Sequence, residues 1–99
     1  MLSIRRVVGQ SMAPSLKDGQ IIVVAKPVFG LKQQDIVVVV HNGMPKVKRL
    51  QQVGSKKVFV VGDNRTESTD SRHFGWLDRS QVTAKVIWPR SEPRISWDD

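Results

Sequence analysis

The chain has 99 residues, a length that accommodates one hydrophobic core and is too short for two. An apolar fraction of 39% and a charged fraction of 25% exclude a compositionally disordered chain. The absence of cysteine excludes disulfides, thiolate catalysis and zinc sites built on sulfur.

The net charge of +7 is placed unevenly along the chain. Positions 1–58 hold ten Lys or Arg against two acidic residues, and positions 59–99 hold six against seven. A basic half could attract nucleic acid, anionic lipid or an acidic substrate, or it could only keep a small domain soluble.

The hydrophobic pattern predicts short strands and turns with very little helix. The expected strands are 2–8, 20–26, 36–41, 46–51, 57–61 and 82–88, with a short helical turn at 77–81. Asn42-Gly43 is the strongest hairpin signal in the chain. We therefore expect a mainly β fold, a compact antiparallel or mixed β sandwich or coiled barrel, with a single domain at 1–88 and a polar C-terminal tail at 89–99.

A constrained bend at Ser11 is the first candidate for chemistry. Pro14 follows Met12 and Ala13, and its ring fixes its own φ and disfavours helix just before it. Such a bend can expose one hydroxyl while the N–H groups beside it point the same way, which suits the oxyanion of a tetrahedral intermediate. A turn serine that only bonds the nearby backbone fits the same residues.

Lys48 is the second candidate. Strand alternation puts Lys46 and Lys48 on one face and Val47 and Arg49 on the other, without deciding which face is buried. An exposed lysine is the common case. To serve as a base near neutral pH, Lys48 would need its pKa lowered by about three units, roughly 4 kcal/mol, which requires desolvation by apolar neighbours.

The polar loop 62–75 is the third candidate. Its charged side chains can pair in several ways: Asp63, Asp70, Arg65 and Arg72. Its hydroxyl groups could satisfy a buried amine: Ser68, Thr69 and Ser71. Fourteen residues bounded by glycines describe an ordered functional loop, and an ion-paired surface connection fits them as well.

Taken together, these segments resemble the type I signal peptidase family. Gly9–Leu16 is similar to its nucleophile box, Val47-Lys48-Arg49 to its general-base strand and residues 62–75 to its last box, in the same order over about residues 7–88. The fold implied is the β fold that signal peptidases share with self-cleaving repressors.

The resemblance implies a Ser/Lys dyad. Ser11 would attack a peptide carbonyl, and Lys48 would take its proton and return it to the leaving amine. Ser68 would orient Lys48, and the Ser11 backbone N–H would donate to the oxyanion. The loop would be held by three structural residues: Asp63, Asp70 and Arg72.

The chain also departs from the family pattern. Gly9 stands where some members carry a second hydroxyl donor, and Gly19-Gln20 and Gln34-Asp35 stand where members have Gly-Asp pairs. We expect neither the membrane anchor nor the insertion domain of the family in this chain, because residues 1–8 hold no apolar run long enough for a signal sequence or membrane span.

A further likeness concerns the substrate. Glu67–Arg72 followed by Phe74-Gly75 is similar to the peptidases that mature nickel-type superoxide dismutase by removing an N-terminal leader. It implies a cytoplasmic enzyme that binds an extended peptide as a strand, with no cofactor and no nucleic acid. The alternative is a membrane-associated signal peptidase I whose anchor is absent from this sequence.

Other function classes remain open. A Ser/His/Asp hydrolase could be drawn from Ser11, from His41 or His73, and from Asp63 or Asp70. A self-cleaving repressor-type domain and a non-catalytic basic β module that binds nucleic acid are the others. No metal site is expected, because the two histidines lack a ligand cluster.

Overall fold

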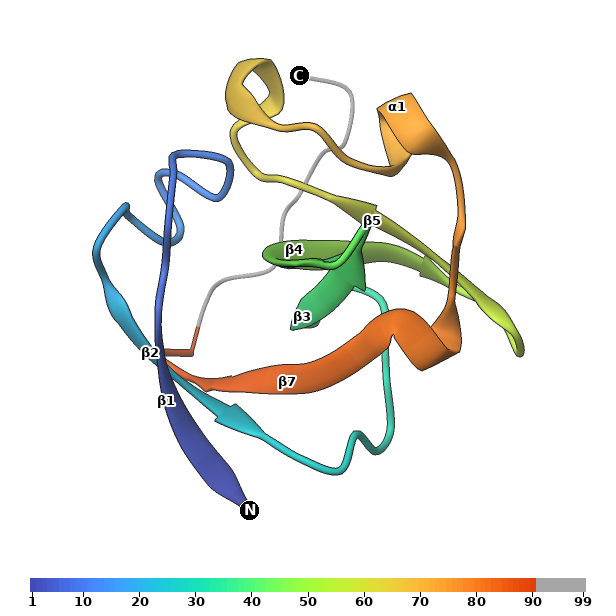
Figure 1. Ribbon diagram of the computed structural model, residues 1–99, viewed down its shortest axis with the longest axis horizontal. Helices are drawn as coiled ribbons and strands as arrows, with labels where there is room; N and C mark the ends of the chain where they lie inside the picture. Colours follow the sequence, from blue (N-terminus) through green and yellow to red (C-terminus); the bar gives the residue numbers. More distant parts are fainter. Residues whose placement is uncertain (91–99) are drawn as a thin grey trace.

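The computed structural model describes residues 1–90 as a curled antiparallel sheet with very little helix (Figure 1). Its strands are β1 (Leu2–Arg6), β2 (Ile21–Ala25), β3 (Ile36–His41), β4 (Met44–Val53), β5 (Lys57–Val61), β6 (Leu77–Asp78) and β7 (Val82–Trp88). They are ordered β1-β2-β7-β3-β4-β5-β6, and each neighbouring pair within residues 1–90 is antiparallel. The predicted mainly β class is confirmed.

β3 lies at the centre because both of its faces are buried. Ile36 and Val38 pack into one apolar cluster with Val7, Met12, Leu16, Ile22, Val24 and Ala84. Val37 and Val39 pack into a second cluster with Leu50, Val58, Val60, Leu77 and Val82. An uninterrupted apolar run is what a strand covered on both sides requires, so the run at 36–40 reflects this central position.

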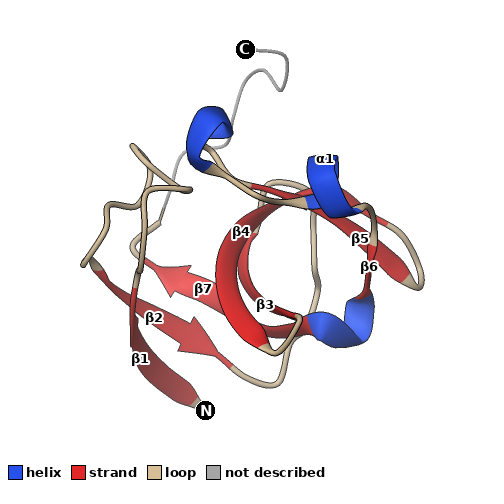
Figure 2. Ribbon diagram, turned by 45° about the horizontal axis from the view of Figure 1, so that its top comes forward, coloured by secondary structure: helices blue, strands red, loops and turns tan. Residues whose placement is uncertain are grey.

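The hairpin between β3 and β4 follows from its turn residues. Asn42 and Gly43 have φ values of 52° and 75°, which only Gly and Asn adopt readily. The two-residue turn places Met44 directly opposite His41. β4 therefore starts before the expected 46–51 range, and it bends strongly where it passes from β3 to β5 (Figure 2).

The segment after β5 holds more structure than the sequence predicted. The loop 62–75 contains a 3-10 turn, η1 (Arg65–Glu67), and a one-turn helix, α1 (Ser71–Phe74). The Asp70 side chain accepts from the Arg72 N–H, and the Asp70 N–H donates to the His73 ring, a capping box that starts α1. The helical turn expected at 77–81 is divided into β6 and the 3-10 turn η2 (Arg79–Gln81).

Two further expectations concern the C-terminal tail and membrane spans. Most of the predicted tail, residues 91–99, lies outside the described residues. Among residues 1–90, no helix has the length and apolar character needed to cross a membrane.

Candidate active site

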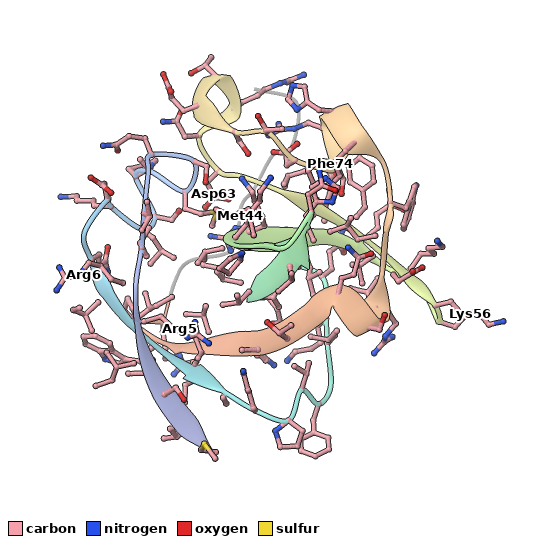
Figure 3. All side chains as sticks on the ribbon, viewed as in Figure 1. Arg5, Arg6, Met44, Lys56, Asp63 and Phe74 are labelled. Carbon is pink, nitrogen blue, oxygen red and sulfur yellow. The ribbon has the colours of Figure 1, made fainter. Side chains whose placement is uncertain are left out.

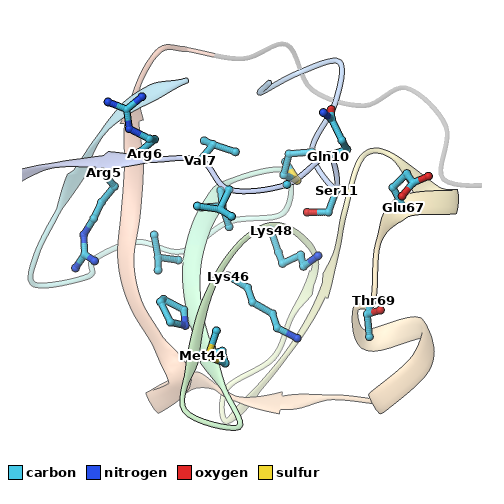
Figure 4. A pocket seen from close by; sticks show the side chains of 16 residues that line it. Arg5, Arg6, Val7, Gln10, Ser11, Met44, Lys46, Lys48, Glu67 and Thr69 are labelled. Carbon is cyan, nitrogen blue, oxygen red and sulfur yellow. The ribbon is translucent and has the colours of Figure 1, made fainter. Parts of the chain in front are cut away.

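A pocket of about 450 Å³ separates the chain segment 5–12 from the first half of β4. Ser11 and Lys48 both line it, and Figure 4 shows their side chains at the same end. Much of the rest of the wall is apolar: Val7, Val8, Met12, Val38, Met44, Pro45 and Val47. The structure thus brings two of the predicted site residues, 37 positions apart in sequence, to one cavity.

Ser11 is held in a turn fastened at both ends. Gly9 has a φ of 91°, which favours glycine, and its N–H donates to the Asp18 carboxylate at 2.8 Å. Met12 is fully buried in the core beside it. The carbonyl of Ser11 accepts a hydrogen bond from the Asn64 N–H at 2.8 Å, so the predicted nucleophile is tied to the loop 62–75 through its backbone.

Lys48 is almost entirely buried, with 3% of its surface exposed. Its Nζ donates to Ser68 Oγ at 3.0 Å. Burial lowers the pKa of Lys48 from its ordinary 10.5 to about 8, because charging the amine in this site forfeits its hydration. The Asp70 carboxylate opposes the shift, and the charges of Lys46 and Arg72 reinforce it.

Ser68 links the amine to a buried carboxylate. Ser68 Oγ lies 2.6 Å from Asp70 Oδ2, and an ionised carboxylate can only accept, so the Ser68 hydroxyl donates a hydrogen bond to Asp70 and accepts one from Lys48. Burial favours the neutral acid, but hydrogen bonds from Arg72, Ser68 and the Gly62 N–H outweigh it and lower the pKa of Asp70 to about 2. Asp70 is therefore ionised across the neutral range.

Gly62 passes between Ser11 and Ser68 with no room for a side chain. A Cβ built there would lie 2.5 Å from the Ser11 carbonyl oxygen and closer still to Ser68 Oγ. The Gly62 N–H also donates to Asp70 Oδ2 at 2.7 Å. Close approach of this backbone to both hydroxyl residues explains why glycine begins the loop.

Asp63 belongs to a different network from Lys48. Its carboxylate accepts from Arg49 Nε and Nη2 at 2.9 and 2.8 Å and from Ser15 Oγ at 2.5 Å. Arg49 Nη1 donates to the Gln34 carbonyl at 2.9 Å. Both members of the ion pair are buried, and sequence reasoning missed Arg49 because alternation assigns only one of Lys48 and Arg49 to a covered face.

Several predicted groups are not joined. Among residues 1–90, the Ser11 hydroxyl makes no hydrogen bond with the Lys48 amine, which is directed at Ser68. Neither histidine lines the pocket: the His41 ring stacks on Phe74 with centroids 4.0 Å apart, and the His73 ring caps α1. The described part of the chain contains no group of three side chains suited to a metal ion.

The comparisons with known proteins identify the family of the chain. The sequence profile of the family "Signal peptidase, peptidase S26" matches residues 40–90, just over half of the chain. This chain belongs to the signal peptidase S26 family. The matched stretch of this S26 member includes Lys48, Ser68, Asp70 and Arg72, and Ser11 precedes it.

Individual S26 relatives match shorter stretches. Signal peptidase I of Bacillus caldolyticus is 51% identical over 35 residues, covering 32% of this chain and 19% of that protein. Signal peptidase IB of Staphylococcus aureus strain MRSA252 is 44% identical over 45 residues, covering 42% and 24%. The chain therefore spans about a fifth to a quarter of the length of the curated relatives it matches. Its family is one of serine endopeptidases.

Proposed function

We propose that this chain is a serine endopeptidase in which Ser11 and Lys48 form a catalytic dyad that removes an N-terminal leader or signal-type peptide from a precursor protein. The observation that carries the proposal is the buried Lys48 amine, held by Ser68 at the end of the pocket that Ser11 also lines. With a pKa of about 8, about a tenth of this amine is uncharged at pH 7 and able to accept a proton.

In the proposed reaction, Lys48 transfers one proton from the nucleophile to the leaving group. As Ser11 Oγ attacks the scissile carbonyl, its proton passes to the lone pair of Lys48 Nζ, and the ammonium then protonates the leaving amine. Water next attacks the acyl ester on Ser11, with Lys48 as base again, and Ser11 Oγ recovers its proton. Ser68 Oγ accepts a hydrogen bond from Lys48 Nζ and so orients the amine and its lone pair. Asp70 accepts from Ser68 and Arg72 and so holds Ser68 in place, and the Asp63–Arg49 pair anchors the start of the loop 62–75.

The oxyanion requires a donor beside the nucleophile. The Ser11 N–H has no acceptor within residues 1–90, which leaves it available to a developing negative charge. Gly9 cannot supply a second donor from a side chain. The direct Ser11–Lys48 hydrogen bond is expected to form when a substrate closes the pocket, since catalytic hydrogen bonds tighten in the Michaelis complex.

A free strand edge suits an extended substrate. β4 pairs with β3 along 44–49, but with β5 only from Arg49 onward, so one edge of residues 44–48 is left without a strand partner in the described sheet. Pro45, which lacks an N–H, is a residue suited to such an edge. A peptide added to this edge by main-chain hydrogen bonds would pass Lys48 and reach Ser11.

For the substrate itself we propose a nickel-type superoxide dismutase precursor processed in the cytoplasm. The support is the likeness of Glu67–Arg72 and Phe74-Gly75 to the peptidases that mature such enzymes. The alternative is a membrane-associated signal peptidase acting on secreted precursors; its support is that the matched relatives are named signal peptidase I and IB.

The test is to incubate the protein with both kinds of precursor and to read the new N-termini by mass spectrometry. Ser11→Ala and Lys48→Ala should abolish cleavage, whereas His41→Gln and His73→Asn should retain it. Cleavage that survives Lys48→Ala and fails in a histidine variant would replace the dyad with a Ser/His/Asp triad. Salt-dependent binding to any DNA or RNA without cleavage would favour the non-catalytic module.

A further inference from the structure

The walls of the Ser11 pocket are unevenly charged. Besides Lys48, three cations line the pocket, Arg5, Arg6 and Lys46, against a single carboxylate, Glu67. Figure 4 shows Glu67 near Ser11 and the two arginines on the opposite side. Within residues 1–90, none of the three cations is in an ion pair. The pocket lining therefore carries more positive than negative charge, and none of these three cations is neutralised by an ion pair within residues 1–90.

Arg5 is the arginine on the inner face of β1, where its side chain remains exposed. In the β1–β2 pairing Arg5 lies opposite Ile22, which is fully buried, and residues opposite each other share a face of the sheet. Arg6 lies opposite the exposed Ile21, and its guanidinium donates to the Gly19 carbonyl at 3.1 Å. The charge on the inner face of β1 at this point thus comes from Arg5.

Lys46 supplies the charge of the facing wall. It precedes Lys48 by two positions on the same side of β4, which places their Cα atoms about 7 Å apart. Lys46 is half-buried, and its Nζ lies 5.4 Å from the centroid of the Phe74 ring. This cation–π contact favours one position of the amine, on the side of Lys46 that faces α1, before a ligand arrives.

We propose that Arg5 and Lys46 select substrates that carry an acidic side chain a few residues from the cleaved bond. The proposal rests on the proposed peptidase function, because it takes this pocket as the substrate site. An extended peptide advances about 3.4 Å per residue, so a side chain about two residues from the bond opposite Lys48 reaches Lys46. Each partly exposed pair should favour the acid by about two- to fivefold.

The experiment uses two sets of short fluorescein-labelled peptides built from alanine, valine and serine. In one set a single Asp is moved through each position, and in the other Asn takes its place. Binding to the Ser11→Ala protein is followed by fluorescence anisotropy, and cleavage by the wild-type protein is followed by mass spectrometry. Arg5→Gln and Lys46→Gln are compared with Lys56→Gln, which removes the same charge from an exposed hairpin tip far from Arg5 (Figure 3).

We expect tighter binding of Asp than of Asn peptides at one or two adjacent positions, with the preference lost as salt rises. Arg5→Gln and Lys46→Gln should each bring the Asp-to-Asn ratio toward one, and Lys56→Gln should leave it unchanged. The ratio matters because Lys46 also affects the pKa of Lys48, and Lys46→Gln therefore changes cleavage of both peptide sets equally.

The outcomes separate this inference from the proposed function. Cleavage of Asp and Asn peptides with equal efficiency would overturn the acid selection and leave the peptidase intact. Preferential binding of Asp peptides to the Ser11→Ala protein, with no cleavage by the wild type, would overturn the peptidase and support acid recognition. If Lys56→Gln lost the preference for Asp over Asn peptides as fully as Arg5→Gln and Lys46→Gln, the acid selection by Arg5 and Lys46 would be overturned, since net charge alone would then explain the binding.

Discussion

At the scale of single residues, the central problem is to lower the pKa of a lysine that lies close to a carboxylate. A direct contact between Lys48 and Asp70 would hold the amine as an ammonium ion. Ser68 stands between them, and the oxygens of Asp70 are occupied by Arg72, Ser68 and the Gly62 N–H. Because Arg72 balances the charge of Asp70, burial remains the dominant influence on Lys48.

The proposed base predicts the pH dependence of cleavage. Since the pKa of Lys48 is about 8, kcat/KM should rise about tenfold per pH unit below that value and level off above it. Arg72→Gln removes a charge that lowers this pKa, so its profile should move to higher pH. The measurement is kcat/KM from pH 6 to 10 on one peptide, with Lys56→Gln as the control. A flat wild-type profile would exclude Lys48 as the base.

The same burial should cost stability. The pKa of Lys48 is about 8 in the folded chain and near 10.5 in the unfolded chain, so at pH 7 the buried ammonium destabilises the fold by about 3 kcal/mol. Lys48→Met keeps the apolar stem and should raise the free energy of unfolding at pH 7.

The pH dependence of this effect has a definite sign. Between pH 8 and 10.5 the folded lysine is neutral while the unfolded one is still protonated, so wild-type stability rises with pH relative to the variant. Urea unfolding of both proteins at pH 7 and pH 10 should show the gap narrowing. A variant less stable than wild type at pH 7 would indicate that Lys48 is a structural residue.

At the scale of elements, the strands were predictable where the pattern was local. The bounds of β3, β5 and β7 follow from their β-branched runs, and the first hairpin follows from Asn42-Gly43. Contacts between segments distant in sequence could not be predicted from a local pattern. The bond from the Asn64 N–H to the Ser11 carbonyl joins residues 53 positions apart.

The candidate site shows the same division. Motif likeness pointed to Ser11, Lys48 and Ser68, but alternation could not show that consecutive residues Lys48 and Arg49 are both buried. That burial arises because β4 is covered on both faces at this point of the curled sheet. The sequence also left the ion-pair partner of Asp63 open, because its own loop contains two arginines. The structure shows that Asp63 binds Arg49 of β4.

The turn before β3 carries strain that can be tested. Gln34 has a φ of 83°, a left-handed conformation that favours glycine, and the sequence has glutamine where the resembled family has glycine. Its N–H donates to the Leu50 carbonyl and its carbonyl accepts from Arg49, so the backbone is fixed in this conformation. Gln34→Gly should stabilise the protein by up to about 1 kcal/mol, because it relieves this strain.

Gln33→Gly is the matched control for that prediction. Gln33 is exposed and its φ is not in the left-handed region, so glycine there only adds freedom to the unfolded chain and should destabilise. Thermal unfolding of the two variants distinguishes them. A gain of stability in Gln34→Gly and a loss in Gln33→Gly would fit the strain, whereas a loss of stability in both would show that the strain at Gln34 is smaller than what its side chain and the stiffer chain contribute.

At the scale of the whole molecule, the Arg49–Asp63 ion pair fastens the site to the sheet. Arg49 comes from β4 and Asp63 from the loop 62–75, while Ser15 and Gln34 bind the same pair from the Ser11 turn and from the turn before β3. Four segments distant in sequence therefore meet at one buried charge pair. Because Asp63 directly precedes Asn64, the position of the Ser11 carbonyl depends on this pair as well.

Breaking this pair should be far more costly than breaking an exposed one. Arg49→Met or Asp63→Leu leaves a buried charge without its counterion, which should cost about 3–5 kcal/mol in the free energy of unfolding. The double variant Arg49→Met with Asp63→Leu removes both charges and should cost less than the sum of the two single changes. The Lys57–Asp78 pair, with both side chains 58% exposed, is the control, and its double-mutant cycle should give a coupling below about 1 kcal/mol. Urea unfolding of both cycles at pH 7 decides the matter, since equal couplings would mean that Arg49 and Asp63 hold these segments together no more firmly than a surface contact does.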